Sequence, residues 1–266
     1  VRSSAASDVY KRQLLRNAMK QSKACIFIGQ GFIGGAPDGT TTTLGREGSD
    51  YSAAVAANIL DAESMSVWKD VDGILNADPK VFPDAVQIAE LNYLDTIELA
   101  YSGAQIIHPK TIKPLQNKNI PLYVRPFGDK RKPGTVIRRM SAPIEVPILI
   151  LKKDQVLLTI RSRDFSFVLE EKFAAIFSLL ERYRIKVNLV HNSAVNLSLC
   201  VDNSWHIDEA IQALRNEEFD VMKVENMELL TIRGYNGDLM ERYASGPEVF
   251  LLQRTQSTAR IVRKNR

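Results

Sequence analysis

A charged, proline-rich segment divides this chain into two parts that differ in their expected order of helices and strands. Residues 130–147 begin with the cationic run KRK and contain three prolines. A chain of 266 residues can bury one large core or two modest ones, and this break favours two. We place the linker at residues 138–150, after a first unit at 14–137.

In the first unit, apolar strand-like runs alternate with segments of helical spacing. This alternation predicts a mostly parallel α/β sheet covered by helices on both faces. Residues 72–85 are expected to form a loop, because Pro79 and Pro83 prevent a helix. Residues 1–13 show no clear periodicity, and we expect them to be a non-native extension. The expected elements are a helix from about Leu14, a buried strand at 24–34, helices at 51–60, 93–102 and 111–117, and strands at 64–71 and 120–127.

Beyond the linker the order changes to strand, helix, two strands, helix, strand. Residues 151–226 contain this βαββαβ order, which is typical of a ferredoxin-like α+β unit. Residues 227–266 repeat a shorter strand-helix-strand-strand pattern. This second pattern is too short to bury its own sheet face, so we expect it to pair with the first unit or with another chain.

A polar loop stands directly before the alanine-rich helix at 51–60. Four threonines and a leucine lead into Gly45, Arg46, Gly48, Ser49 and Asp50. Simple helix capping would account for Ser49 or Asp50, with the glycines easing the turn. Capping does not account for an arginine in a glycine-flanked loop. A guanidinium, a hydroxyl and free backbone N–H groups at a helix N-terminus suit an anion, so we favour an anion-binding site.

Charge and cysteine content limit the classes of partner. The net charge of +4 is mild and the cations are interleaved with acidic residues, which favours small anionic ligands over nucleic acid. No apolar run approaches the length of a membrane span, and the first residues lack the apolar core of a signal peptide. Cys25 and Cys200 show no disulfide or zinc spacing, and a reducing cytoplasm fits them.

Residues 24–137 resemble the C-terminal half of the catalytic domain of aspartokinases, which belong to the amino acid kinase family. The region from about Gln155 is similar to the ACT-type regulatory region of the same enzymes. The motifs that carry the resemblance are GFIG at 31–34, TTTLGREGSDY at 41–51, WKDVDGILNADPK at 68–80, ELAYSGAQIIHPKT at 98–111 and PGTVI at 133–137.

The resemblance implies transfer of the γ-phosphoryl group of ATP to the side-chain carboxylate of L-aspartate, the first step toward lysine, threonine and methionine. It implies that Mg²⁺ arrives with the nucleotide and takes no protein ligands. Asp50 matches the catalytic aspartate, and Arg46 and Ser49 match residues that hold the substrate. The implied ATP-binding residues are Lys69, Asp70, Leu75, Lys80 and Gln105. Relatives often carry arginine at position 80 and lysine at position 105.

One family feature is not found in this sequence. Relatives open with a strand and a KFGG-type loop whose lysine and glycines bind the phosphates, and nothing here matches it. We therefore expect the chain to be N-terminally truncated and inactive by itself, because a phosphoryl-transfer site depends on such donors. Genomic DNA upstream of Leu14 that continues into a KFGG segment would establish this.

The regulatory resemblance leaves a second function open, a noncatalytic subunit that binds an amino acid such as lysine or threonine. The candidate effector-binding residues are Phe167, Val168, Leu169, Asn188, His191 and Ser193. Turn formation is the alternative for Asn188 and Ser193. Another amino acid kinase is a third possibility, against which the REGSDY loop and the ACT-like tail argue. Dimerisation through the ACT-like units is expected, because their sheet edges need partners. No dehydrogenase region follows, which favours the monofunctional form.

Overall fold

The computed structural model describes residues 5–36, 38–104, 107–139, 146–163, 170–246 and 248–265. The chain separates into two compact units, one of residues 1–79 and 84–144 and the other of residues 80–83 and 145–266. The boundary therefore falls inside the expected linker, apart from the short segment 80–83. Each unit is described by itself.

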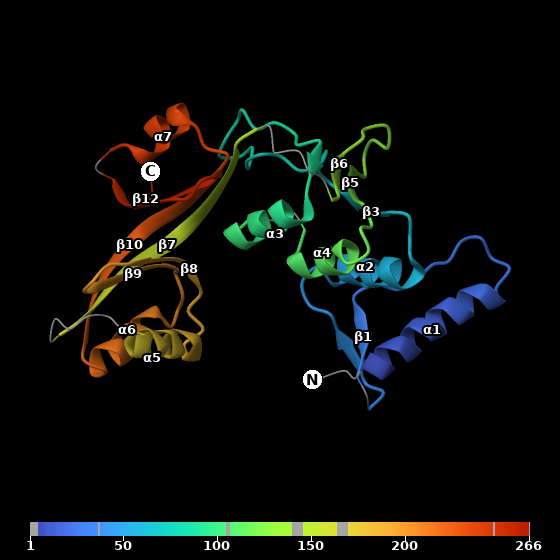
Figure 1. Ribbon diagram of the computed structural model, residues 1–266, viewed down its shortest axis with the longest axis horizontal. Helices are drawn as coiled ribbons and strands as arrows, with labels where there is room; N and C mark the ends of the chain where they lie inside the picture. The colour runs from blue at the N-terminus through green and yellow to red at the C-terminus, as the bar shows by residue number, and fades with distance from the viewer. Residues whose placement is uncertain are drawn as a thin grey trace. The chain divides into compact units, whose positions relative to one another are not determined.

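The first unit combines four helices with a small hairpin and a four-stranded sheet (Figure 1). Helix α2 packs against α4, and α4 packs against α3. The elements are α1 (Ala5–Gln21), β1 (Ile33–Gly35), β2 (Thr41–Thr43), α2 (Gly48–Leu60), β3 (Met65–Lys69), β4 (Glu90–Leu91), α3 (Tyr93–Ser102), α4 (Pro109–Gln116), β5 (Leu122–Pro126) and β6 (Thr135–Ile137).

The sheet of the first unit is mixed, which corrects the mostly parallel, doubly covered sheet predicted from sequence. Its order is β3-β5-β6-β4, and β5 and β6 form an antiparallel pair while β3–β5 and β4–β6 are parallel. The prediction was wrong because no strand was expected at β6, which lies in a short segment rich in charges and prolines. Along β3, buried Met65 and Val67 alternate with exposed Ser66 and Trp68, as in a sheet covered on one face.

A glycine makes the β5–β6 hairpin possible. Gly134 has a φ of +72°, and a Cβ at this position would lie 2.0 Å from the carbonyl oxygen of Val124. The backbones of the two strands therefore approach too closely for any side chain at this residue. Gly134 lies in the PGTVI motif, which gives that motif a structural reason.

Two further expectations for the first unit need correction. The apolar run at 24–34 does not form a buried strand: Ile26 and Ile28 are 81% and 98% exposed, and only its last residues enter the β1–β2 hairpin. Within the described residues no other strand pairs with residues 24–31, so their backbone groups lack the ladder that a buried strand requires. Helix α1 begins at Ala5, well before the expected start near Leu14.

Asparagine caps helix α3. Asn92 Oδ1 accepts a hydrogen bond of 2.7 Å from the backbone N–H of Asp95. Changing Asn92 to alanine is expected to lower the free energy of unfolding by about 1 kcal/mol, because this N–H loses its acceptor. Urea denaturation checks the change, and Asn92→Ser, which keeps an acceptor oxygen, should lose only a few tenths of a kcal/mol. Equal losses in both variants would contradict the capping role.

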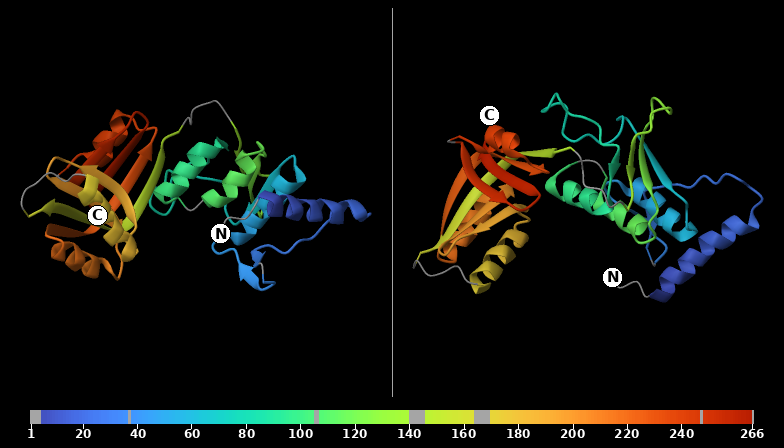
Figure 2. Two further views of the ribbon diagram at one scale, coloured as in Figure 1. Left: turned by 60° about the horizontal axis from the view of Figure 1, so that its bottom comes forward. Right: turned by 45° about the horizontal axis from the view of Figure 1, so that its top comes forward.

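The second unit is built on one six-stranded antiparallel sheet of order β11-β12-β10-β7-β9-β8. Both views in Figure 2 show its yellow-to-red strands as one continuous sheet. The shorter C-terminal pattern thus pairs with the βαββαβ part through shared long strands. The elements are β7 (Ile148–Ser162), α5 (Glu170–Arg182), β8 (Val187–Asn192), β9 (Asn196–Asp202), α6 (Ile207–Asn216), β10 (Phe219–Arg233), α7 (Gly237–Ala244), β11 (Val249–Arg254) and β12 (Thr258–Lys264).

Both faces of this sheet are apolar. Val156, Leu158 and Ile160 of β7 pack with α5 and α6, whereas the alternating residue Leu157 faces a second cluster that includes Cys200 and Leu229. A third cluster gathers side chains from β10, β12 and α7. Phe82, from the short segment 80–83, joins this third cluster and meets the ring of Tyr243 edge to face at 6.2 Å.

Candidate functional site

The polar loop ends at the start of α2, as the sequence indicated, but it is not a simple cap. Glu47, the residue before the helix, has a left-handed backbone with φ of 54° and makes no side-chain capping bond. Ser49 and Asp50 lie inside the first turn, one and two residues beyond the first helical residue, Gly48. The N–H of Gly48 donates to the carbonyl oxygen of Gly45 at 3.0 Å. The N–H groups of Ser49 and Asp50 have no partner within the helix, so they are the backbone donors that suit an anion.

An ion pair joins two of the predicted site residues. The Nζ atom of Lys69, at the end of β3, lies 2.9 Å from Oδ2 of Asp50 in the first turn of α2. Their side chains are 29% and 16% exposed, so the pair is partly buried and still accessible. A carboxylate in this position fixes the ammonium at the end of a strand that runs parallel to β5. Ligands of α/β sheets characteristically bind at this end of parallel strands.

Residues at the start of α4 hold the polar loop in place. The ring nitrogen Nδ1 of His108 caps α4 by accepting a hydrogen bond of 3.2 Å from the backbone N–H of Lys110. The backbone N–H of His108 donates to Glu47 Oε2 at 2.7 Å. The ammonium of Lys110 donates to the carbonyl oxygens of Leu44 and Arg46. His108 therefore links the start of α4 to the polar loop. Glu47 and Lys110 were missed, although both lie in the quoted REGSDY and IIHPKT motifs.

Arg46 and Ser49 present their side chains to solvent. Both residues are exposed, and neither side chain makes a hydrogen bond or ion pair to another described residue. Gly31 lies against Ser49: a Cβ on this glycine would be 3.1 Å from Ser49 Cα and Cβ. The structure therefore brings Asp50 together with Lys69, and it leaves the guanidinium of Arg46 and the hydroxyl of Ser49 available to a ligand.

The remaining predicted nucleotide residues are spread along the segment after β3. Asp70 is exposed directly after the strand, and Leu75 forms an isolated antiparallel bridge with Gln87. Lys80 belongs to the segment 80–83 that packs with the second unit. Gln105 lies outside the described residues.

A protein-held metal centre finds no support in the described ranges. No group of three or more histidine, cysteine, aspartate or glutamate side chains is placed there to hold an ion. Nor does any helix among the described residues have the length and apolar character needed to cross a membrane.

The predicted effector residues fall into three groups. Phe167, Val168 and Leu169 lie outside the described residues. Ser193 forms a turn with Asn196, as the structural alternative predicted, and His191 is exposed on β8. Asn188 is not a turn residue, because its side chain joins a polar cluster on the sheet.

That cluster contains an acidic group and a buried thiol. Burial raises the pKa of Asp202, but hydrogen bonds from Gln155, Lys152 and Asn188 outweigh it and hold the pKa below its usual value. Burial raises the pKa of the Cys200 thiol to about 12, so this cysteine is not a nucleophile at neutral pH.

Known proteins share both the sequence and the architecture. The amino acid kinase family profile matches residues 2–126. The lysine-sensitive aspartokinase 3 of Escherichia coli is 35% identical over 233 residues, which cover 85% of this chain and 51% of that protein. Aspartokinase 1 of Arabidopsis thaliana, a chloroplastic protein, is 36% identical over 209 residues, covering 74% of this chain and 36% of that protein.

Solved aspartokinase structures have a similar fold. E. coli aspartokinase III in complex with aspartate and ADP superposes with a TM-score of 0.77 at 28% identity, over 98% of this chain and 61% of that one. The same enzyme with lysine and aspartate gives a TM-score of 0.73 at 29% identity, over 97% and 60%. The chain spans about half the length of the first of these curated relatives.

The loop at the start of α2, the ion pair at the end of β3 and these likenesses together define the class. The chain belongs to the amino acid kinase family. Within it, the chain is a homologue of the aspartokinases and includes a region corresponding to their C-terminal regulatory part.

Proposed function

We propose that this chain carries the aspartate-binding and nucleotide-facing half of an aspartate kinase, which transfers the γ-phosphoryl group of ATP to the side-chain carboxylate of L-aspartate. The observation that carries the proposal is the Asp50–Lys69 ion pair at 2.9 Å, placed between an uncapped helix N-terminus and the end of β3. The aspartate and ADP bound to the E. coli relative supply the ligand classes.

The chemistry places few demands on the protein beyond position and charge. The substrate carboxylate is already ionised at neutral pH, since its reference pKa is about 3.9, so no general base is needed. Its oxygen attacks the γ-phosphorus while the bond to the ADP oxygen breaks, and no proton moves. In this scheme the ammonium of Lys69, oriented by Asp50, offsets the charge that develops on the transferring group.

The polar loop supplies the substrate contacts. The exposed guanidinium of Arg46 can take a carboxylate with two parallel hydrogen bonds, and Ser49 and the first N–H groups of α2 lie within the same turn. Lys110 and Glu47 position the loop. We further propose that Asp70, Leu75, Lys80 and Gln105 contact the nucleotide, and that Mg²⁺ reaches the site with the phosphates of ATP.

Ligand-induced stabilisation tests this assignment without requiring turnover. A ligand that binds only the folded chain raises the melting temperature. MgADP and L-aspartate should each raise it. Lys69→Met should remove the MgADP shift, and Arg46→Met should remove the aspartate shift. Lys113→Met, a charge change on the exposed side of α4, should keep both shifts. A full MgADP shift in Lys69→Met would contradict the role given to Lys69.

The second unit supports amino acid feedback as part of the same function. We propose that its βαββαβ part is a ferredoxin-like, ACT-type unit that binds an effector such as lysine or threonine and that pairs two chains in a homodimer. The order β10-β7-β9-β8 with two intervening helices supports this assignment. Lysine is bound in one structure of the E. coli relative.

A noncatalytic regulatory protein is the alternative function. It would respond to lysine or threonine in the same melting experiment and would ignore MgADP and aspartate. The partly buried Asp50–Lys69 pair favours the kinase, because amino acid regulation alone gives no reason for it.

A further inference from the structure

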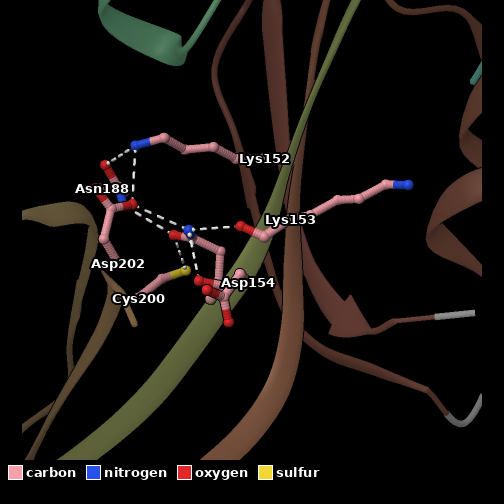
Figure 3. Close-up of polar contacts among 7 residues, drawn as sticks. Lys152, Lys153, Asp154, Asn188, Cys200 and Asp202 are labelled. Atoms are coloured by element: carbon pink, nitrogen blue, oxygen red, sulfur yellow. Dashed lines mark hydrogen bonds and ion pairs between the residues drawn. The ribbon is translucent and has the colours of Figure 1, made fainter. Parts of the chain in front are cut away.

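A polar cluster interrupts the apolar face of the second unit that lies opposite α5 and α6. Its members come from three neighbouring strands: Lys152 and Gln155 from β7, Asn188 from β8, and Cys200 and Asp202 from β9. Figure 3 labels Lys152, Asn188, Cys200 and Asp202. At its centre, Lys152 Nζ donates to Asn188 Oδ1 at 2.7 Å and to Asp202 Oδ1 at 3.0 Å. The Lys152 side chain is only 19% exposed.

The groups around this ammonium are held in place independently of it. Asn188 Nδ2 donates to Asp202 Oδ1 and to Gln155 Oε1, both at 2.7 Å. Gln155, which is 2% exposed, donates to Asp202 Oδ1 at 3.0 Å and to the carbonyl oxygens of Lys153 and Asp154. The amide of Asn188 is thereby oriented with its oxygen toward the ammonium. The Asp202 carboxylate and the amide oxygen of Asn188 are thus held by hydrogen bonds to other groups. Together they form a cradle, that is, a pair of acceptors for a positively charged hydrogen-bond donor.

An irregularity in β7 brings Lys152 to this cradle. In a regular strand, residues three apart point to opposite faces, so Lys152 and Gln155 would be on different sides of the sheet. Asp154 has a φ of 54°, and the pairing with β10 shifts between Gln155 and Lys152. This bulge places both side chains on one face. Figure 3 shows the neighbouring Lys153 extending away from the cluster.

We propose that Asn188 and Asp202 form a binding site for a primary ammonium group, and that the chain fills this site with its own Lys152. The site is therefore closed to free amines in the native protein, and an amine could enter only when Lys152 leaves. The ammonium site itself does not depend on the proposed regulatory function. Only a role in feedback for the replacement of Lys152 by a free amine rests on that function.

Chemical rescue tests the proposal. Lys152→Ala removes three methylene groups and the ammonium, which together correspond to n-propylammonium. The variant should melt about 4 °C or more below the native chain, because the partly buried Asp202 carboxylate loses its cation. Adding n-propylammonium should raise the melting temperature of Lys152→Ala by about 2 °C or more relative to tetramethylammonium at equal ionic strength. Tetramethylammonium carries the charge but has no N–H donor.

Matched variants separate a site from a general salt effect. Lys153→Ala makes the same change one residue away on an exposed side chain and should show neither the loss nor the rescue. Burial and the charge of Lys152 lower the pKa of nearby Lys186. Rescue is therefore also measured in the Lys152→Ala, Lys186→Ala double variant, where Lys186 cannot take the vacant place. If Lys152→Ala does not fold, Lys152→Met replaces it, because methionine keeps an unbranched apolar chain. Lys152→Met should be less stable than the native chain, and n-propylammonium should not raise its melting temperature.

Equal responses of native and Lys152→Ala protein to n-propylammonium would overturn the proposal. So would equal effects of propylammonium and tetramethylammonium on the alanine variant. Neither measurement involves aspartate or nucleotide, so failure here is distinct from failure of the kinase assignment.

Discussion

Replacing Arg263 with methionine is expected to lower the free energy of unfolding of the second unit by about 3–5 kcal/mol, because it leaves a buried carboxylate without its cation. Arg263 Nε donates to Glu228 Oε1 at 2.7 Å, and the two residues are 6% and 3% exposed. They face each other across the β10–β12 pairing. The loss should appear in urea denaturation and in faster amide hydrogen exchange along these two strands.

A double variant separates the cost of an unpaired charge from the value of the pair. Glu228→Met combined with Arg263→Met should recover most of the loss, because two apolar side chains can replace a buried ion pair with little net cost. Arg254→Met, on an exposed arginine of β11, should change stability by no more than about 0.5 kcal/mol. A double variant as unstable as Arg263→Met alone would show that the guanidinium matters through packing instead.

Replacing Gly134 with alanine is expected to lower the free energy of unfolding of the first unit by about 3 kcal/mol or more, since the change combines a steric overlap with a strained backbone. The new Cβ would lie 2.0 Å from the Val124 carbonyl oxygen, at a φ of +72°. The β5–β6 hairpin would have to open to accept it. Gly134 also provides the carbonyl that accepts from Gln87 Nε2 at 2.9 Å, so displacement would disturb the loop after β3.

The same hairpin offers a matched glycine. A Cβ at Gly128 would meet no atom within 4 Å, so Gly128→Ala should leave the melting temperature nearly unchanged. Thermal denaturation of the two variants side by side checks the prediction. Similar melting temperatures for both would mean that the hairpin relaxes without cost.

Local chemistry made much of the fold predictable. Helix α3 has the predicted bounds, because Asn92 before it and Gly103 after it mark where the helical spacing begins and stops. The βαββαβ order was visible because the apolar period changes at each element. The mixed sheet was not predictable, because β6 has only three residues and lies among charges and prolines. The apolar run at 24–34 looked like a strand, but a strand also needs a neighbour that local sequence does not reveal.

The candidate site was also predictable only where local sequence determines it. The REGSDY loop and Lys69 were singled out from motifs, and the structure joins Asp50 to Lys69 by an ion pair. The contacts of Glu47 with His108, 61 residues away in the chain, depend on tertiary structure and could not be predicted from spacing. The ammonium cradle in the second unit was missed for a related reason: it requires a bulge, which moves Lys152 to the face opposite the one that alternation predicts.

Strands β7 and β10, with 15 residues each, run the whole way through both halves of the second unit. The backbone of both strands therefore belongs to both halves, and neither half can come away from the other without breaking the β7–β10 pairing.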